Sequence, residues 1–239
     1  MHQLVTRIGL HVAAFAGATV VLGQTAVRVG HAAPAPAVVA APVPAFDPPA
    51  AERRETAVFA GGCFWGVQGV FQHVNGVTSA VSGYTGGERG TARYQAVGSG
   101  TTGHAEAVRV TFDPARVSYG TLLRIYFAVV ADPTTLNRQG PDRGPQYRSA
   151  LFPTTPRQRE VAARYLAQLG QAKLWDRPIV TRIEPAAAFY PAERYHQDYL
   201  TRHPDAAYIR IHDLPKVAAL KRGFPAQYRA TPVLVGAPS

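Results

Sequence analysis

Cysteine is almost absent from this 239-residue sequence, which contains Cys63 alone. One thiol cannot form an internal disulfide, and it cannot supply the sets of thiolates that hold structural zinc or iron–sulfur clusters. The fold must therefore depend on its apolar core. Any sulfur chemistry in the chain must belong to Cys63.

Acidic residues are also scarce, with 15 Asp and Glu against 25 Lys and Arg and a net charge of +10. Such an excess suits nucleic-acid binding, but the basic residues here are scattered and form no stripe. We therefore expect no nucleic-acid partner. A hydrophobic content of 46% over this length predicts one globular domain with an appendage.

The chain begins with MHQLVTR, which has one arginine and no acid, and continues into an apolar run over residues 8–23 and small residues near Ala33. This order is typical of a secretory signal peptide. We interpret residues 1–33 as an export segment and expect a periplasmic or cell-envelope protein. An N-terminal anchor is the alternative, although Gln24 and Arg28 interrupt the roughly 20 apolar residues that a spanning helix needs.

Residues 34–53 are largely Ala, Pro and Val, a composition that favours extended chain and buries little surface. We interpret them as a linker. The folded domain is expected over residues 54–229, followed by a C-terminal tail at 230–239. No repeat period is visible, which excludes solenoids and propellers.

Hydrophobic periodicity predicts strands interleaved with helices. Strand patterns cover residues 55–60, 77–84, 104–112, 148–152 and 178–183. Helical patterns cover residues 64–74, 119–130, 156–169 and 191–201, and residues 134–146 form a long polar loop. Because the connections are hairpin-like, we expect a two-layer α+β domain.

Cys63 follows Gly61 and Gly62 at a predicted helix start. Unpaired N–H groups and the helix dipole favour an anion there, which predicts a lowered thiol pKa and a reactive thiolate. The neighbouring Phe64 and Trp65 can form an apolar wall that receives a methyl group or thioether. The alternatives are an inert buried cysteine and two ordinary core aromatics.

Glu106 is predicted to lie on the apolar face of strand 104–112. Burial disfavours a carboxylate, so we expect a raised pKa and a neutral acid able to donate a proton. An ion pair with His104 or an arginine is the alternative.

Weaker candidates lie in predicted loops, which often carry chemistry on a rigid scaffold: Tyr94, Asp142 and Tyr147. His196 and Asp198 have the spacing of a metal pair. They lack a third ligand, so we expect no bound metal.

Five motifs, in one order, resemble the A-type peptide methionine sulfoxide reductases. They are GGCFWG at 61–66, SGYTGG at 82–87, TGHAEAV at 102–108, LNRQGPDRGPQYRS at 136–149 and YHQDYL at 195–200. The resemblance extends over residues 56–208. It implies an α+β domain around a mixed sheet, and reduction of the S epimer of methionine sulfoxide, in proteins and as the free amino acid.

The resemblance also implies roles for the candidate residues. Cys63 attacks the sulfoxide sulfur and becomes a sulfenic acid, while Phe64 and Trp65 hold the substrate methyl group. Protonated Glu106 polarises the sulfoxide oxygen and delivers a proton to it. The same resemblance implies that the oxygen receives hydrogen bonds from two tyrosines and that an aspartate orders the site: Tyr94, Tyr147 and Asp142.

The chain departs from the family pattern in three places, of which one, Gly98 where some members have cysteine, is expected to be harmless. Pro145 replaces a threonine that many members have beside Tyr147, and we expect a turn to tolerate it. Residues 216–239 contain no cysteine, although many members place resolving cysteines there. We therefore expect an external thiol to return Cys63 to its reduced form. This thiol belongs to a thioredoxin-like protein, a glutaredoxin-like protein or a small molecule. We expect no bound cofactor.

Other functions remain open from the residues alone. A one-cysteine peroxidase also passes through a sulfenic acid. A cysteine hydrolase needs a histidine beside the sulfur, for which His104 and His196 are the candidates. A module that only binds methionine-rich segments needs no thiol chemistry at all. We expect a monomer in each case.

Overall fold

The computed structural model describes residues 38–236. The predicted export segment at residues 1–33 lies outside the described residues. Among the helices that are described, none has both the length and the apolar character needed to span a bilayer.

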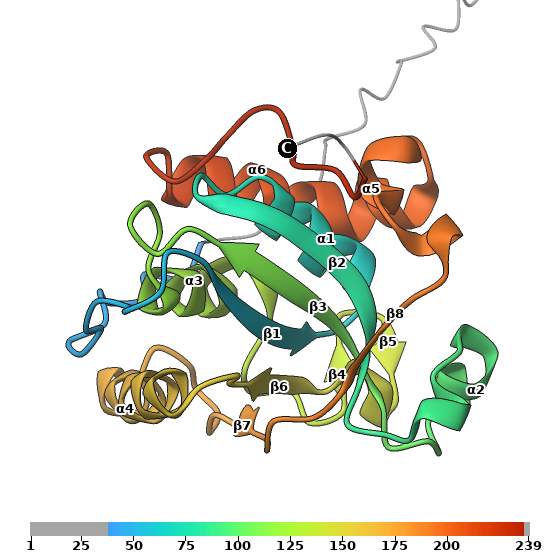
Figure 1. The fold of residues 1–239 in the computed structure, drawn as a ribbon, viewed down its shortest axis with the longest axis horizontal. Helices are drawn as coiled ribbons and strands as arrows, with labels where there is room; N and C mark the ends of the chain where they lie inside the picture. Colours follow the sequence, from blue (N-terminus) through green and yellow to red (C-terminus); the bar gives the residue numbers. More distant parts are fainter. Residues whose placement is uncertain (1–37, 237–239) are drawn as a thin grey trace, which may run out of the picture. The chain divides into compact units, whose positions relative to one another are not determined.

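A six-stranded sheet with strand order β7-β6-β1-β3-β2-β8 forms the centre of the fold (Figure 1). Its strands pair antiparallel except for β6 and β7, which are parallel, so the sheet is mixed. A separate two-stranded hairpin consists of β4 and β5. The strand bounds are β1 Glu55–Gly61, β2 Val77–Thr85, β3 Ala105–Phe112, β4 Arg138–Gln139, β5 Asp142–Arg143, β6 Ser149–Phe152, β7 Arg182–Ile183 and β8 Phe189–Pro191.

Two of the described helices begin where capping residues predict them. Ser118 and Thr155 each accept a hydrogen bond from the backbone N–H three residues later, at the start of α3 and α4. The α-helices are α1 Phe64–Gln72, α2 Tyr94–Gly98, α3 Tyr119–Ile125, α4 Pro156–Ala172, α5 Tyr199–Arg202 and α6 Leu214–Gly223. Short 3-10 or π turns are η1 Arg89–Thr91, η2 Tyr126–Val130, η3 Pro145–Tyr147, η4 Arg194–His196 and η5 Ile209–Asp213.

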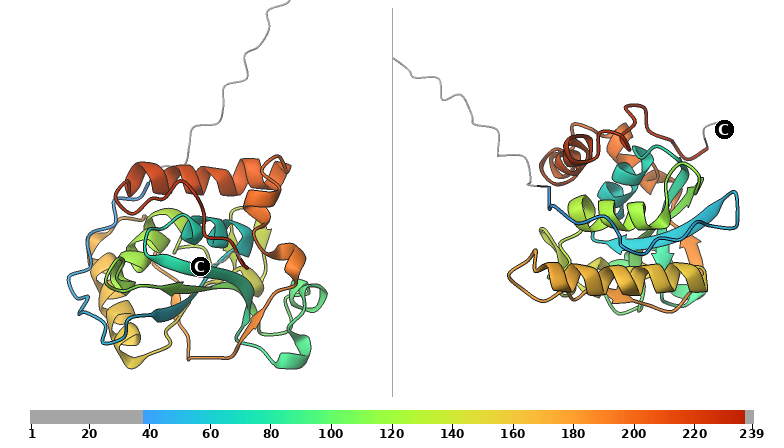
Figure 2. Two further views of the ribbon diagram at one scale, coloured as in Figure 1. Left: turned by 45° about the horizontal axis from the view of Figure 1, so that its top comes forward. Right: turned by 90° about the vertical axis from the view of Figure 1, so that its left-hand side faces the viewer.

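The main hydrophobic core lies on one face of the sheet, and a smaller cluster lies on the other. Helix α1 packs on β2 and β3, and α6 packs against α1, while α4 packs on α3 and β7 (Figures 1 and 2). On this face Phe59 stacks on Phe71, with ring centroids 4.8 Å apart. The opposite face holds a smaller cluster that includes Ala60, Ala105 and Ala107. This arrangement confirms the predicted α+β class with a mixed sheet.

The described parts of the predicted linker and of the predicted tail pack against the domain. The segment from Val38 onward lies against the domain: Ala41 is 2% exposed, and its carbonyl accepts a 2.8 Å hydrogen bond from Arg124 Nε. Tyr165 donates to the Pro42 carbonyl at 2.8 Å. At the other end, Val233 N donates to Gln72 O at 3.0 Å. Proline-rich chain packs here because side chains of α3 and α4 satisfy its carbonyl groups.

Several predicted elements differ in detail. The predicted strand at 178–183 is reduced to β7, and the predicted loop at 134–146 contains the β4–β5 hairpin. The predicted helix at 191–201 is two short turns, because Asp198 between them adopts a left-handed conformation with φ 58°. Tyr94 begins α2 instead of lying in a loop, and α6 was not predicted.

Candidate active site

Cys63 lies in the turn between β1 and α1, at the N-cap position of the helix. The preceding Gly62 has a positive φ of 88°, and a Cβ there would lie 2.5 Å from the Cβ of Gln139. Glycine is therefore required for the hairpin to approach the turn. The N-cap position confirms that Cys63 lies at a helix start, as predicted. The residue is 9% exposed.

The predicted lowering of the Cys63 pKa is wrong. Burial raises the thiol pKa well above its ordinary value, and the carboxylates of Glu106 and Asp213 raise it further. The Trp65 backbone N–H and the Lys216 ammonium act in the expected, lowering direction, but they are outweighed. The resting thiol is thus protonated, because desolvation exceeds the stabilisation that the helix terminus supplies.

Glu106 is held directly beside the nucleophile. It is 3% exposed on β3, and its Oε2 accepts a 3.0 Å hydrogen bond from the backbone N–H of Phe64, the first residue of α1. Burial raises the pKa of Glu106 to about 8, against the lowering effect of the Phe64 N–H. The carboxyl is therefore mostly protonated at neutral pH, as the sequence predicted.

The alternative ion pair of Glu106 is not observed. No Lys, Arg or His side chain of the described residues lies within salt-bridge distance of this carboxyl. His104 instead accepts a hydrogen bond from Gly87 N at 3.2 Å and places its other ring nitrogen 2.9 Å from the Glu88 carbonyl oxygen. Glu106 is therefore available as an acid.

Two tyrosines lie near the same acid. Burial, followed by the charge of Glu106, raises the pKa of both Tyr94 and Tyr147, so their hydroxyl groups remain protonated donors. Tyr94 is oriented by its backbone N–H, which donates to Glu193 Oε1 at 2.9 Å. Tyr147 ends the 3-10 turn that Pro145 begins, where a proline needs no N–H partner. Pro145 thus occupies the first position of this turn.

Aromatic rings surround the two residues that follow Cys63. Trp65 is half-buried and stacks on Tyr199, with ring centroids 3.9 Å apart and an interplanar angle of 11°. Its Nε1 donates to His196 Nδ1 at 3.1 Å. Phe64 is 1% exposed and packs on Tyr84 and His196. The indole is therefore fixed by a stack and a hydrogen bond, which makes it a rigid apolar wall.

Asp142 reaches the site from the β4–β5 hairpin. Its Oδ2 accepts a short hydrogen bond from the hydroxyl of Tyr208, and Tyr208 packs edge-on against Trp65. Charges at Cys63 and Asp142 both raise the Tyr208 pKa, after burial as the main cause. The structure thus joins the hairpin to the aromatic wall.

A buried ion pair lies against the first turn of α1. Asp213 is fully buried, and Lys216 Nζ lies 3.4 Å from its Oδ1. A Cβ on Gly66 would lie only 2.1 Å from the same oxygen, so the carboxylate rests directly on the helix backbone. The other oxygen of Asp213 has no hydrogen-bond partner. This pair supplies one negative and one positive charge close to Cys63.

Metal ligands are not grouped in this part of the molecule. Within residues 38–236, no three His, Cys, Asp or Glu side chains lie close enough together to hold a metal ion. The arrangement around Cys63 instead combines a thiol, a neutral acid, two hydroxyl donors and an apolar wall. In such a set the thiol can reduce a polar group, the acid and the hydroxyl groups can bind its oxygen, and the apolar wall can hold an apolar substituent.

Comparison with known proteins decides the family. A family model described as peptide methionine sulfoxide reductase matches residues 55–228. The chain belongs to the peptide methionine sulfoxide reductase family. A family member from Mesorhizobium japonicum is 59% identical over 190 residues, which cover 80% of this chain and 97% of that protein. Another from Synechocystis is 47% identical over 195 residues, covering 81% of this chain and 91% of that protein.

A solved member of the family has the same fold. Methionine sulfoxide reductase A of Corynebacterium diphtheriae is 35% identical, and the match covers 64% of this chain and 76% of that one with a TM-score of 0.54. The resemblance found in the sequence motifs is thereby confirmed. As a peptide methionine sulfoxide reductase, the chain is an oxidoreductase that reduces methionine sulfoxide to methionine.

The sequence missed several residues of the site. Tyr199 lies within the YHQDYL motif, so the motif itself contained its signal. Tyr208, Asp213 and Lys216 fall in no recognised motif. Their positions depend on contacts with residues far away in the chain, such as Asp142, which is 66 positions from Tyr208.

Proposed function

We propose that Cys63 is the nucleophile of the sulfoxide reduction and that Glu106 is its general acid. The observation that carries this assignment is the Phe64 N–H bond to Glu106 Oε2, at the helix that Cys63 caps. It holds the acid at the same helix terminus as the thiol. It also occupies only one carboxyl oxygen, so the other oxygen can carry the proton toward the substrate.

The first half-reaction balances with both groups protonated at the start. Glu106 donates its proton to the sulfoxide oxygen while the Cys63 sulfur attacks the sulfoxide sulfur, and the thiol proton passes to Glu106. The oxygen then transfers to Cys63 as the bond between the two sulfur atoms breaks. Methionine leaves, reduced by two electrons, and Cys63 is a sulfenic acid, oxidised by two electrons.

Tyr94 and Tyr147 donate hydrogen bonds to the sulfoxide oxygen in this proposal. Their raised pKa values keep both hydroxyl groups in the donor form. The substrate methyl group rests against Phe64 and Trp65, and Asp142 orders the cleft through Tyr208. A site that fixes the methyl group, the oxygen and the direction of thiol attack on the sulfur accepts one hand of a chiral sulfoxide. The resemblance in the sequence motifs implies that this hand is the S epimer.

Recycling in this proposal requires a thiol from outside the chain. The sequence holds one cysteine, so no second thiol can form an intramolecular disulfide. An external thiol attacks the sulfenic acid to give a mixed disulfide and water, and a second thiol releases Cys63. Thioredoxin-like proteins, glutaredoxin-like proteins and small thiols all supply this chemistry.

Location and assembly are proposed on sequence grounds. The order of charges and apolar residues at 1–33 supports export to the periplasm or cell envelope, with a retained anchor as the alternative. We propose that the exported protein acts as a monomer on oxidised proteins. Cell fractionation and size-exclusion chromatography of the full chain test these two points.

One assay tests the catalytic assignment. The protein and its Cys63→Ser variant are incubated with each epimer of methionine sulfoxide, or with peroxide, in the presence of dithiothreitol. We expect turnover of the S epimer by the unaltered protein alone. Without dithiothreitol, each molecule releases one methionine and Cys63 then reacts with dimedone. An active Cys63→Ser variant, or peroxide turnover with both sulfoxides inert, would remove Cys63 from this role.

A further inference from the structure

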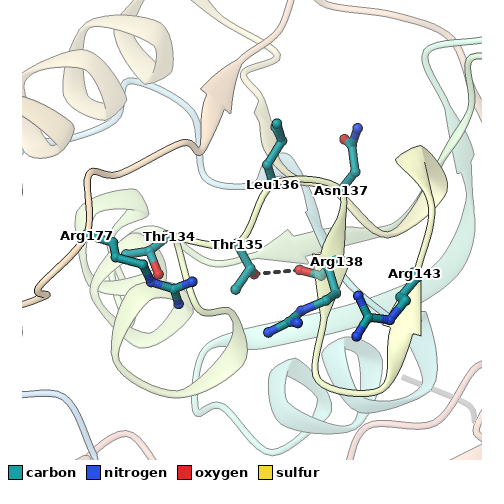
Figure 3. Close-up of a pocket in the computed structure, with 7 residues that line it drawn as sticks. All are labelled: Thr134, Thr135, Leu136, Asn137, Arg138, Arg143 and Arg177. Carbon is teal, nitrogen blue, oxygen red and sulfur yellow. Dashed lines mark hydrogen bonds between the residues drawn. The ribbon is translucent and has the colours of Figure 1, made fainter.

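A hollow of about 280 Å³ with three arginines lies beside the β4–β5 hairpin (Figure 3). Arg138 and Arg143 come from the two strands of the hairpin, and Arg177 comes from the segment after α4. Figure 3 shows the side chains of Arg138 and Arg143 extending toward the side where Arg177 lies. We call this feature the arginine hollow.

The two hairpin arginines are directly paired across the strands, in register Arg138↔Arg143. Like charges at such opposed positions repel each other. The neighbouring pair, Gln139 and Asp142, points to the other face of the hairpin, because successive side chains of a strand alternate. Gln139 contacts the catalytic turn there, at Gly62. One hairpin therefore separates the arginine hollow from the cleft of Cys63.

Carboxylates of the described residues do not balance the positive charge of the three arginines in the arginine hollow. Arg177 lies 3.4 Å from Asp132 Oδ2, while the other oxygen of Asp132 accepts hydrogen bonds from Thr134. In the described part of the chain, no carboxylate lies within salt-bridge distance of Arg138 or Arg143. Three guanidinium groups thus face one carboxylate, and two of them have no acidic partner.

We propose that the arginine hollow binds the carboxylates of an acidic segment in the protein substrate. Guanidinium groups bind carboxylates through paired, charge-assisted hydrogen bonds. The lining residue Leu136 is 62% exposed, which offers an apolar contact that a polypeptide uses and a free inorganic anion does not. The inference rests on the proposed function of the Cys63 cleft, since the same substrate chain must reach both.

The spacing of acids in the substrate follows from the hairpin between the two sites. An extended chain advances about 3.3 Å per residue, so four to eight residues cover roughly 13 to 26 Å. That length is sufficient to pass around a two-stranded hairpin. Acidic residues at this separation from the methionine sulfoxide are therefore expected to lower KM without changing kcat.

The test uses three peptides of one length, each with one methionine sulfoxide and a cluster six residues away that is acidic, neutral amide or basic. KM and kcat are measured for the unaltered protein, for an Arg138→Gln/Arg143→Gln double variant and for Arg116→Gln as control. Arg116 is exposed and does not line the arginine hollow. Free methionine sulfoxide is measured in parallel.

We expect the acidic peptide to have a KM about 3- to 30-fold below that of the neutral one, the range for two exposed charge pairs. The double variant should lose this preference, while Arg116→Gln keeps it and kcat stays constant. An acidic preference that survives in the double variant, or no preference in the unaltered protein, overturns the proposal. A third result would also overturn the proposal. In it, inorganic phosphate raises the Tm of the unaltered protein but not of the double variant, and KM is the same for the three peptides.

The free substrate separates this inference from the proposed function. If neither the unaltered protein nor either variant reduces free methionine sulfoxide, the result counts against the proposed role of Cys63 itself. Normal reduction of the free substrate together with equal KM values for the three peptides would count against the arginine hollow alone. The comparison among peptides uses the unaltered protein, so the absence of an acidic preference overturns the arginine hollow even if the double variant does not fold.

Discussion

The backbone N–H of Phe64 donates a 3.0 Å hydrogen bond to Glu106 Oε2 and so joins the first residue of α1 to the middle of the sheet. That N–H is one of the donors that a helix cannot satisfy internally. A carboxyl from β3 occupies it, although the two residues are 42 positions apart. One helix terminus therefore holds both the nucleophile at Cys63 and the acid.

Replacing this acid with an amide should remove proton donation while keeping the geometry. The side chain of Glu106→Gln retains an oxygen that accepts the Phe64 N–H, but it has no acidic proton. We expect the single-turnover rate with the S epimer to fall by about 10²-fold or more, the usual scale of general acid catalysis. Far-UV circular dichroism serves as the folding control. A rate within a factor of two of the unaltered protein would exclude Glu106 from the mechanism.

Raising the pH should slow sulfoxide reduction. The reactive form requires protonated Glu106, whose pKa is raised from 4.5 to about 8, and this form is lost as pH rises through that value. We expect the single-turnover rate to decline above about pH 8. The Glu106→Gln variant should not show this decline with pH, because its amide does not lose a proton in this range. A rate that rises steadily from pH 7 to pH 9 would contradict the assignment.

The same carboxyl should make stability depend on pH. Folded Glu106 binds its proton more tightly than the unfolded chain does, so the stability that it contributes falls as pH rises between 4.5 and about 8. Glu106→Gln removes this dependence. We therefore expect the Tm of the variant, relative to that of the unaltered protein, to be higher at pH 9 than at pH 5. Equal differences at the two pH values would show that Glu106 does not titrate in this range.

Removing the charge of Asp213 and removing the charge of Lys216 should shift the Cys63 pKa in opposite directions. Asp213 raises the pKa of Cys63 and Lys216 lowers it. Asp213→Asn should therefore lower the thiol pKa, and Lys216→Met should raise it. The pH dependence of iodoacetamide alkylation measures both shifts. Shifts of the same sign in the two variants would show that general disruption, and not charge, is responsible.

An added methyl group should destabilise the protein at Gly66 of α1 and not at Gly170 of α4. A Cβ on Gly66 would lie 2.1 Å from Asp213 Oδ1, whereas no atom lies within 4 Å of the Cβ position of Gly170 in α4. We expect Gly66→Ala to lower the free energy of unfolding by about 1–3 kcal/mol, as overpacking does. Gly170→Ala should raise it by about 0.5–1 kcal/mol. Urea unfolding of both variants checks the difference, and equal effects would contradict the close contact.

The parts of the fold that the sequence predicted correctly depend on local signals. Paired glycines, Cys63 and the spacing of Val67 and Val70 indicate the β1–α1 turn within a dozen residues. The alternation along β3 places Glu106 on the helix-covered face. Such patterns arise from the periods of strands and helices and need no knowledge of distant partners.

The parts that it missed depend on contacts across the chain. Composition predicts a free linker, yet Arg124 and Tyr165 bind its carbonyl groups in the fold. Helix-terminus rules predict a lowered Cys63 pKa, but burial and Asp213, which is 150 residues away, reverse the sign. No local pattern reports which distant carboxylate will be enclosed beside a sulfur atom.

The low exposure of Cys63, at 9%, bears on how the enzyme is reused. In the proposed cycle the oxidised sulfur stays in this sheltered position, so a thiol donor must reach it there. A donor that presents its thiol on a protruding segment should therefore restore the enzyme faster than one whose own thiol is recessed.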